Sequence, residues 1–269
     1  SAEKVVAHFH EWMTASGGLF LRKNSPYVAT VFSTHATVAG RCIAGNGLSL
    51  YSDLHKFNAD ELARRFNVTA KHSIEKMAAS YHDAFLTVSD ITANESKYLL
   101  GREVTHITPN GFENDFVWQG EEYNQKRKEA RKAMIEVAEA CLQHKFEKEP
   151  LIIGTSGRYE FRNKGLDIFM ESLKRLATCA LDREILAYIT VPAANNGARA
   201  DLVHHLADAT QPIDEAQWKF STHYLENPQW DPISQSVRGS VLESADSKVK
   251  VIFVPSYLNS ADGVFNKNY

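Results

Sequence analysis

The sequence predicts an α/β protein made of parts of two sheet-based domains, in which the strands run mostly parallel. Short β-rich runs alternate with helical patterns along the chain. Several of these runs are apolar throughout, as expected for parallel strands covered on both faces. The alternation breaks once, over residues 111–150, and a new strand follows Pro150. A length of 269 residues allows two domains or one large one.

The individual elements follow from local composition. Seven β-rich runs predict strands at Val5–Phe9, Val28–Phe32, Ala84–Val88, Val104–Ile107, Leu151–Ile153, Leu186–Val191 and Val249–Val254. Helical patterns predict helices at Ala70–Tyr81, Ser89–Leu99, Glu121–Lys148 and Leu166–Ala180. Ser89 or Asp90 is suited to cap the second helix. The charged third helix is expected to be the first helical element after a domain crossover, and its pattern favours a solvated amphipathic helix without chemistry.

Composition excludes several classes of protein. A hydrophobic content of 43% supports sizeable cores, and a net charge of −3 gives no case for nucleic-acid binding. The three cysteines include no C-x-x-C pair, which argues against a disulfide framework or zinc knuckle and favours a reducing, cytoplasmic location. No apolar run has membrane-spanning length and no signal peptide is visible, so no membrane partner is expected.

Polar clusters recur directly after the predicted strands. They are His10-Glu11-Trp12, Ser33-Thr34-His35, Ser89-Asp90, Pro109-Asn110-Gly111 and Gly154–Arg158. Ligands of open α/β sheets bind outside the carboxyl ends of the strands. Each cluster alone is compatible with ordinary loop chemistry, but their shared edge predicts a ligand cleft between the two domains.

The strongest single signal is the segment Gly154–Gly165, which joins a predicted strand to a predicted helix. Glycines allow close approach to an anion, and a helix N-terminus offers free N–H groups. The segment also carries Arg158, Arg162 and Lys164, and guanidinium and ammonium groups suit phosphate. The pattern favours a diphosphate ligand, with a solvated turn as the alternative.

Other candidate residues are weaker when considered alone. His8 and His10 share one face of a strand, and Glu11 beside them makes a metal site conceivable, although a buried histidine bonded to backbone explains the pattern too. His35 is expected to begin a helix that runs through Arg41, so both could border a site, or both could be surface residues. Asn110-Gly111 is also a common turn dipeptide.

Several blocks together resemble the eukaryotic-type glycogen synthases, glycosyltransferase family 3. The blocks occur in order as His8-Phe-His-Glu-Trp12, Phe32-Ser-Thr-His-Ala-Thr37 with Gly40-Arg41, Thr87–Thr92, Thr108–Gly111, Ser156-Gly-Arg-Tyr-Glu-Phe-Arg-Asn-Lys-Gly165 and Val249–Pro255. The resemblance covers essentially the whole chain. It implies a GT-B fold, in which two Rossmann-like domains face across a cleft.

The resemblance also implies the reaction and its partners. Glucose moves from a nucleotide sugar, UDP-glucose or alternatively ADP-glucose, to the non-reducing end of an α-1,4-glucan such as glycogen. The anomeric configuration is retained, and neither a cofactor nor a metal is expected. Arg158 and Lys164 match the pair that contacts the donor diphosphate. Arg41 matches an active-site arginine near the same phosphates, and His35 matches a histidine close to the transferring glucose. Cleft-lining roles are implied for His10, Glu11, Trp12 and Asn110.

The same resemblance predicts that the chain is an internal piece of such a synthase. Residues 1–115 correspond to the later part of the N-terminal Rossmann-like domain, 116–150 to the crossover and its helix, and 151–269 to the earlier part of the nucleotide-sugar-binding domain. The family's N-terminal glycine-rich loop and its paired glutamates are expected outside this range, so the piece alone is predicted to be inactive. The stretch after Asn196 is much shorter than the family's tetramer-building insertion, which puts that tetramer in doubt and suggests a bacterial relative.

Two other functions compete with the synthase. A metal-dependent hydrolase would use His8, His10 and Glu11, but nothing else in the sequence supplies a convincing further ligand set. A non-catalytic module that binds nucleotides or glycans would share the fold, and fold alone does not separate it from a synthase.

Overall fold

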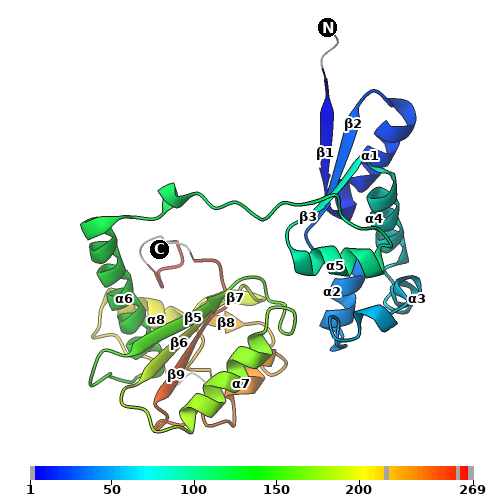
Figure 1. The fold of residues 1–269 in the computed structure, drawn as a ribbon. Coiled ribbons are helices and arrows are strands. Elements are labelled where there is room, and N and C mark those ends of the chain that lie inside the picture. The colour runs from blue at the N-terminus through cyan, green and yellow to red at the C-terminus, as the bar shows by residue number, and fades with distance from the viewer. Residues whose placement is uncertain (1–3, 215–217, 259–260, 266–269) are drawn as a thin grey trace. The chain divides into compact units, whose positions relative to one another are not determined.

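The computed structural model describes residues 4–214, 218–258 and 261–265. The chain divides into two compact units, which we call the N-terminal unit (residues 1–113) and the C-terminal unit (residues 114–269). Figure 1 shows the elements of both units.

The N-terminal unit is a four-stranded parallel sheet with helices between the strands. Its elements are β1 Val6–His10, α1 Glu11–Asn24, β2 Ala29–Thr34, α2 Val38–Gly45, a 3-10 turn Leu54–Lys56, α3 Ala59–Arg65, α4 Thr69–Tyr81, β3 Ala84–Thr87, α5 Asp90–Leu99 and β4 His106–Ile107. The strand order is β1-β2-β3-β4, and all three pairings are parallel.

Two clusters of buried side chains hold this unit together. Under α1 and α4, which lie side by side in Figure 1, Phe32 and Phe85 stack with ring centroids 5.7 Å apart. Small residues such as Ala78 let α4 approach this layer. The second cluster surrounds Ile43 and joins α2 to α3 and α5. Both clusters fix the helices that lead away from the strand ends.

The C-terminal unit has three layers. Its elements are a 3-10 turn Asn114–Phe116, α6 Gly120–Leu142, β5 Leu151–Ser156, α7 Leu166–Ala177, β6 Ile185–Thr190, β7 Asn195–Ala198, α8 Ala200–Ala207, β8 His223–Leu225, α9 Pro232–Val237 and β9 Val249–Val254. Strands β5, β6 and β9 form a parallel sheet, and β7 and β8 form an antiparallel pair. Alternate residues of β6 face two cores, one under α7 and α9 and the other under α6 and α8.

The predicted α/β class with mostly parallel sheets is therefore confirmed. All seven predicted strands are present, and Ser89 caps α5 by accepting a hydrogen bond from the N–H of Thr92. The four predicted helices are present too, but α6 ends at Leu142 rather than Lys148, because Gln143 adopts a left-handed conformation with φ of 52°. The division into residues 1–115, 116–150 and 151–269 of a GT-B enzyme stays a prediction.

One other expectation needs correction. Burial on both faces holds for β6 and β9 but not for β1 or β5, where every second or third residue is exposed. Both of the latter are edge strands of their sheets within the described residues.

Across the same residues, none of the helices combines the length and the apolar character needed to cross a membrane.

Candidate functional site

The polar clusters of the N-terminal unit lie along one edge of its sheet. The parallel register pairs His10 with Ser33, Thr34 with Thr87, and Thr87 with Ile107, so the residues that follow these strands emerge at the same edge. This arrangement was expected from the order of strands and clusters. Asn110 follows β4 in an irregular, exposed segment.

Three histidines gather at this edge. The ring centroids of His8 and His10 are 4.1 Å apart, and those of His10 and His35 are 6.1 Å apart. His8 and His10 thus share a face, as predicted. The Nε2 of His8 lies 2.7 Å from the Oγ of Ser33. Partial burial, together with the neighbouring His10, lowers the pKa of His8 below its usual value, which favours the neutral ring.

Glu11 and Trp12 begin helix α1 next to these rings. Glu11 has a φ of 62°, an unfavourable conformation for a residue other than glycine. In this conformation its carboxylate accepts a hydrogen bond of 2.9 Å from the backbone N–H of His35. Trp12 is half-buried, and the ammonium of Lys71 lies 5.1 Å from the centroid of its ring. Glu11 therefore fixes His35 instead of pointing freely into solvent.

Helix α2 does not begin at His35, as the sequence predicted, but at Val38. Thr37 is its cap, since its hydroxyl accepts a hydrogen bond from the N–H of Gly40. A threonine cap stops the helix from extending toward the strand, so His35 lies in the preceding loop. His35 and Arg41, the latter in the first turn and a half of α2, are both half-buried.

Two buried carboxylates that the sequence analysis missed contact this loop. Glu75 of α4 and Glu95 of α5 are 0% and 2% exposed. Glu75 accepts hydrogen bonds from the hydroxyl of Thr34 at 2.8 Å and from the N–H of Val38 at 2.9 Å. Glu95 accepts from the N–H and the hydroxyl of Thr37 at 2.9 and 2.6 Å. The spacing of Glu75 with Ala78 and Ala79, three and four residues on, could have revealed its place on the buried face.

In the C-terminal unit, the predicted glycine-bearing loop is shorter than expected. Strand β5 continues through Ser156, and Gly154 pairs with Tyr188 of β6. A β-carbon on Gly154 would lie 3.3 Å from the carbonyl oxygen of Tyr188, so this glycine serves close strand packing. The loop proper begins at Gly157, whose φ is 144°, and ends at Gly165, whose φ is 67°.

The cations of this loop are exposed, and a tyrosine between them fixes the loop to the core of the unit. Arg158 and Lys164 are exposed, and a guanidinium nitrogen of Arg158 lies 3.2 Å from a carboxylate oxygen of Glu160. Tyr159 turns inward and donates a hydrogen bond of 2.5 Å to Asp231, the cap of α9. Burial and this carboxylate raise the pKa of Tyr159 well above its usual range, so the hydroxyl stays protonated. Tyr159 thereby anchors the backbone of the loop between Arg158 and Lys164.

Arg158 also lines a cavity of about 370 Å³ at the carboxyl ends of the strands. Ser156, Thr190 and Ser256 contribute to its wall, and each lies at or just past the end of a different strand of the sheet. This is the edge where ligands of parallel α/β sheets bind. Lys164 and Asn110 are not among the residues that line it.

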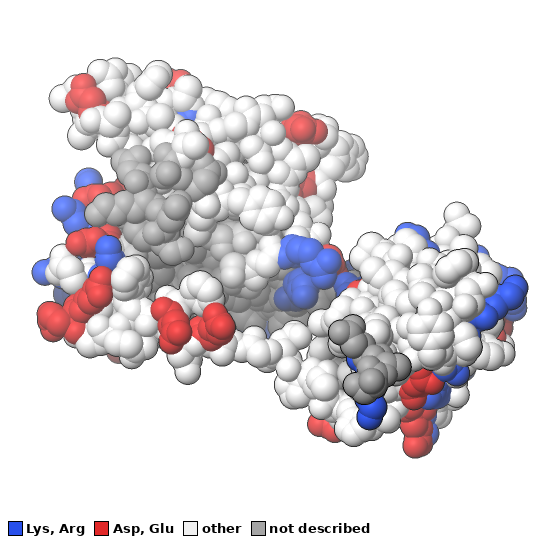
Figure 2. Space-filling model, turned by 90° about the horizontal axis from the view of Figure 1, so that it is seen from above, with Lys and Arg blue, Asp and Glu red and all other residues white. Residues whose placement is uncertain are grey.

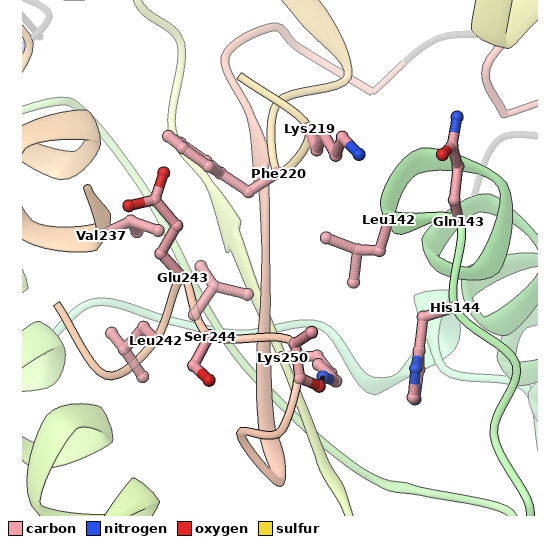
Figure 3. A pocket seen from close by; sticks show the side chains of 12 residues that line it. Leu142, Gln143, His144, Lys219, Phe220, Val237, Leu242, Glu243, Ser244 and Lys250 are labelled. Carbon is pink, nitrogen blue, oxygen red and sulfur yellow. Dashed lines mark hydrogen bonds between the residues drawn. The ribbon is translucent and has the colours of Figure 1, made fainter. Parts of the chain in front are cut away.

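A second cavity, of about 380 Å³, lies at the amino end of β9 (Figure 3). Figure 3 shows Leu142, Gln143 and His144 on one side, Leu242 to Ser244 on the other, and Lys250 between them. None of the predicted site residues lines it.

Figure 2 shows Lys and Arg in small groups, many of them beside Asp or Glu, so positive charge on the drawn face is local rather than continuous.

The metal-hydrolase alternative finds no support in this geometry. Among the described residues, no group of three or more His, Cys, Asp or Glu side chains is arranged to hold a metal ion. The carboxylate of Glu11, the expected third ligand beside His8 and His10, is instead engaged with the backbone of His35.

Parallel sheets with polar loops gathered at the carboxyl ends of their strands define a Rossmann-like α/β protein. Comparison with known families narrows this class, because a family model described as glycogen synthase matches residues 1–217. The chain belongs to the glycogen synthase family.

Named relatives agree with this assignment. The chain is 28% identical to a glycogen [starch] synthase of Neurospora crassa over 98% of its own length and 46% of the relative. It is 34% identical to the Dictyostelium discoideum enzyme over 72% of the chain and 23% of the relative. It is 35% identical to isoform 2 of Saccharomyces cerevisiae over 73% of the chain and 29% of the relative. The chain thus spans less than half the length of each of these relatives.

Proposed function

We propose that the whole protein is a retaining glucosyltransferase that moves glucose from a nucleotide sugar to the non-reducing end of an α-1,4-glucan. The observation that carries this proposal is the anchored loop from Gly157 to Gly165, which presents Arg158 beside the cavity at the carboxyl ends of β5, β6 and β9. Membership of the glycogen synthase family supports a nucleotide sugar as donor and a glucan as acceptor.

The chemistry needs positive charge at the leaving group. Breaking the bond between glucose and phosphate leaves negative charge on the diphosphate, while the sugar gains oxocarbenium character. Arg158 and Lys164 would stabilise that charge as it develops, and Arg41 is proposed to be a further active-site cation. Because side-chain cations of this chain meet the charge, we propose that no metal cofactor takes part.

His35 is proposed to act on the sugar. A half-buried imidazole at the edge of the N-terminal sheet is suited to hydrogen-bond a glucose hydroxyl or to stabilise the transition state. His10 lies next to it, and Trp12 offers an apolar ring beside Lys71. UDP-glucose is the proposed donor, with ADP-glucose as the alternative nucleotide sugar.

Initial-rate transfer of glucose to glycogen tests the proposal. The whole protein is assayed with UDP-glucose and with ADP-glucose side by side, and again after Arg158→Ala. We expect transfer from one of the two nucleotide sugars. In the variant we expect kcat/KM to fall about 100-fold, as when one preorganised group that stabilises transition-state charge is removed. Arg175→Ala is the matched control, because Arg175 is 81% exposed and pairs with Glu171 along α7.

The outcomes separate the competing functions. Transfer that depends on Arg158 and not on Arg175 supports the synthase and identifies the nucleotide. A folded protein that transfers glucose from neither donor, yet binds glycogen or a nucleotide, would instead be a binding module.

A further inference from the structure

Three carboxylates from three helices converge on the loop between β2 and α2. Glu11 of α1 accepts the N–H of His35, Glu95 of α5 accepts that of Thr37, and Glu75 of α4 accepts that of Val38. Their oxygen–nitrogen distances are all 2.9 Å. Three of the four backbone N–H groups from His35 to Val38 are therefore bound by acidic side chains that lie far away in sequence.

The side chains and carbonyls of the loop are held as well. The hydroxyls of Thr34 and Thr37 donate to Glu75 and Glu95. The carbonyl oxygen of Thr34 accepts a hydrogen bond of 2.8 Å from the hydroxyl of Thr87 in β3. A loop with so many buried partners has little freedom to change its backbone conformation.

Gly40 provides independent evidence that the carboxylate of Glu95 belongs in this position. A β-carbon on Gly40 would lie 2.2 Å from Oε1 of Glu95 and 2.8 Å from the hydroxyl oxygen of Thr37. Only glycine leaves room for the carboxylate against the first turn of α2. The glycine immediately before Arg41 is thus explained by close packing against Glu95 and not by backbone flexibility, since it lies within a helix.

The carboxylates also occupy the N-terminus of α2. Glu75 accepts the N–H of Val38, the first residue of α2, and the Thr37 hydroxyl that Glu95 holds accepts the N–H of Gly40, so two donors that a helix start would otherwise offer to an anionic ligand are engaged. Arg41 lies one residue after Gly40, so its position depends on how this helix start is held.

We propose that Glu75 and Glu95 are positioning residues, which hold the loop of His35 and the start of the helix that carries Arg41 in the geometry required for glucosyl transfer. Neither carboxylate reaches solvent, so they act through the groups they hold and not on the substrate. This inference rests on the proposed transferase function.

The test combines activity with a structural signal. Glu95→Gln removes the negative charge, and Gly40→Ala pushes a methyl group against the same carboxylate. In the whole protein we expect each change to lower kcat for transfer from UDP-glucose to glycogen roughly 10- to 100-fold, because a small misplacement of reacting groups is costly. The KM for UDP-glucose should change much less, since the loop from Gly157 to Gly165 is untouched. Glu103→Gln is the control, as Glu103 is 74% exposed in a surface ion pair.

In the 269-residue chain, backbone amide signals in NMR spectra report on the loop directly. We expect the amides of His35, Thr37 and Val38 to shift in both variants while those of β2 and β3 stay in place. A kcat within twofold of wild type in both variants would overturn the proposal, and so would loss of the whole fold in both, which would indicate a purely structural role. A wild-type protein without transfer would instead refute the proposed function, and the amide signals would still decide whether Glu95 holds the loop.

Discussion

Replacing Glu75 with glutamine should abolish a specific pH dependence of stability in the N-terminal unit. Glu75 is fully buried, and burial, followed by repulsion from Glu11 and Glu95, raises its pKa to about 7 against the hydrogen bonds from Val38 and Thr34. Glutamine has nearly the same shape, keeps an acceptor for the N–H of Val38, and does not titrate. Wild type and Glu75→Gln therefore differ mainly in whether the side chain at position 75 can release a proton.

The sign and size of the effect follow from proton linkage. An unfolded chain releases the Glu75 proton near pH 4.5, whereas the folded unit keeps it up to a pH of about 7. Between these values the folded state binds more protons, so the stabilising contribution is complete below pH 4.5 and is lost as the pH rises to about 7. A difference of about 2.5 in pKa corresponds to about 3 kcal/mol of unfolding free energy.

Hydrogen exchange of peptides from β2 and β3 measures this free energy for the N-terminal unit alone, which matters because a two-unit chain has no single free energy of unfolding. We expect the difference in stability between wild type and Glu75→Gln to change by about 3 kcal/mol from pH 4.5 to 8, in favour of the variant at high pH. Parallel stability curves for the two proteins across this range would show that Glu75 titrates normally and would refute the reasoning.

Three further predictions concern the C-terminal unit. Arg199→Met should destabilise this unit by about 3–5 kcal/mol, measured by hydrogen exchange of β6. The side chain of Asp201 is only 5% exposed and lies 2.6 Å from the guanidinium, so the substitution leaves it as a buried unpaired charge. Unchanged protection of β6 would contradict this. Tyr159→Phe should cost about 1–3 kcal/mol in the same measurement and should raise exchange of the loop from Gly157 to Gly165, because one oxygen of the Asp231 carboxylate loses its donor and the N–H of Ile233 loses its acceptor; normal loop exchange would show that the hydroxyl does not anchor it. Gly165→Ala should lower the thermal unfolding temperature of this unit by a few degrees, since φ is 67° there and a β-carbon would meet no other atoms, leaving backbone strain as the only cost; an unchanged temperature would argue against that strain.

The sequence was most informative where a local pattern alone determines the structure. The apolar runs of β6 and β9 predicted buried parallel strands because both faces of these strands meet helices. The polar residues after each strand predicted the shared edge, since parallel strands place their carboxyl ends together. Local patterns were less informative for α6, where a single left-handed residue, Gln143, ends a helix whose composition would support further turns.

The residues that hold the candidate site could not be identified in the same way. Glu75 and Glu95 stand in helices with many charged neighbours, and their partners lie 37 to 58 residues earlier in the chain. Only the folded sheet and its covering helices bring these groups together. His35 was expected inside a helix for the same reason, because the cap at Thr37 is stabilised by long-range contacts as well as by its own hydroxyl.

The convergence of α1, α4 and α5 on one short loop also constrains which changes in chain length this region tolerates. Each residue of a helix advances it by 1.5 Å and about 100°. One residue inserted or deleted in α4 ahead of Glu75 would turn its carboxylate to another side of the helix, away from the loop that it holds. Among natural variants of this region, substitutions on the outer faces of α4 and α5 should therefore be common, whereas insertions and deletions should be confined to the connections between elements.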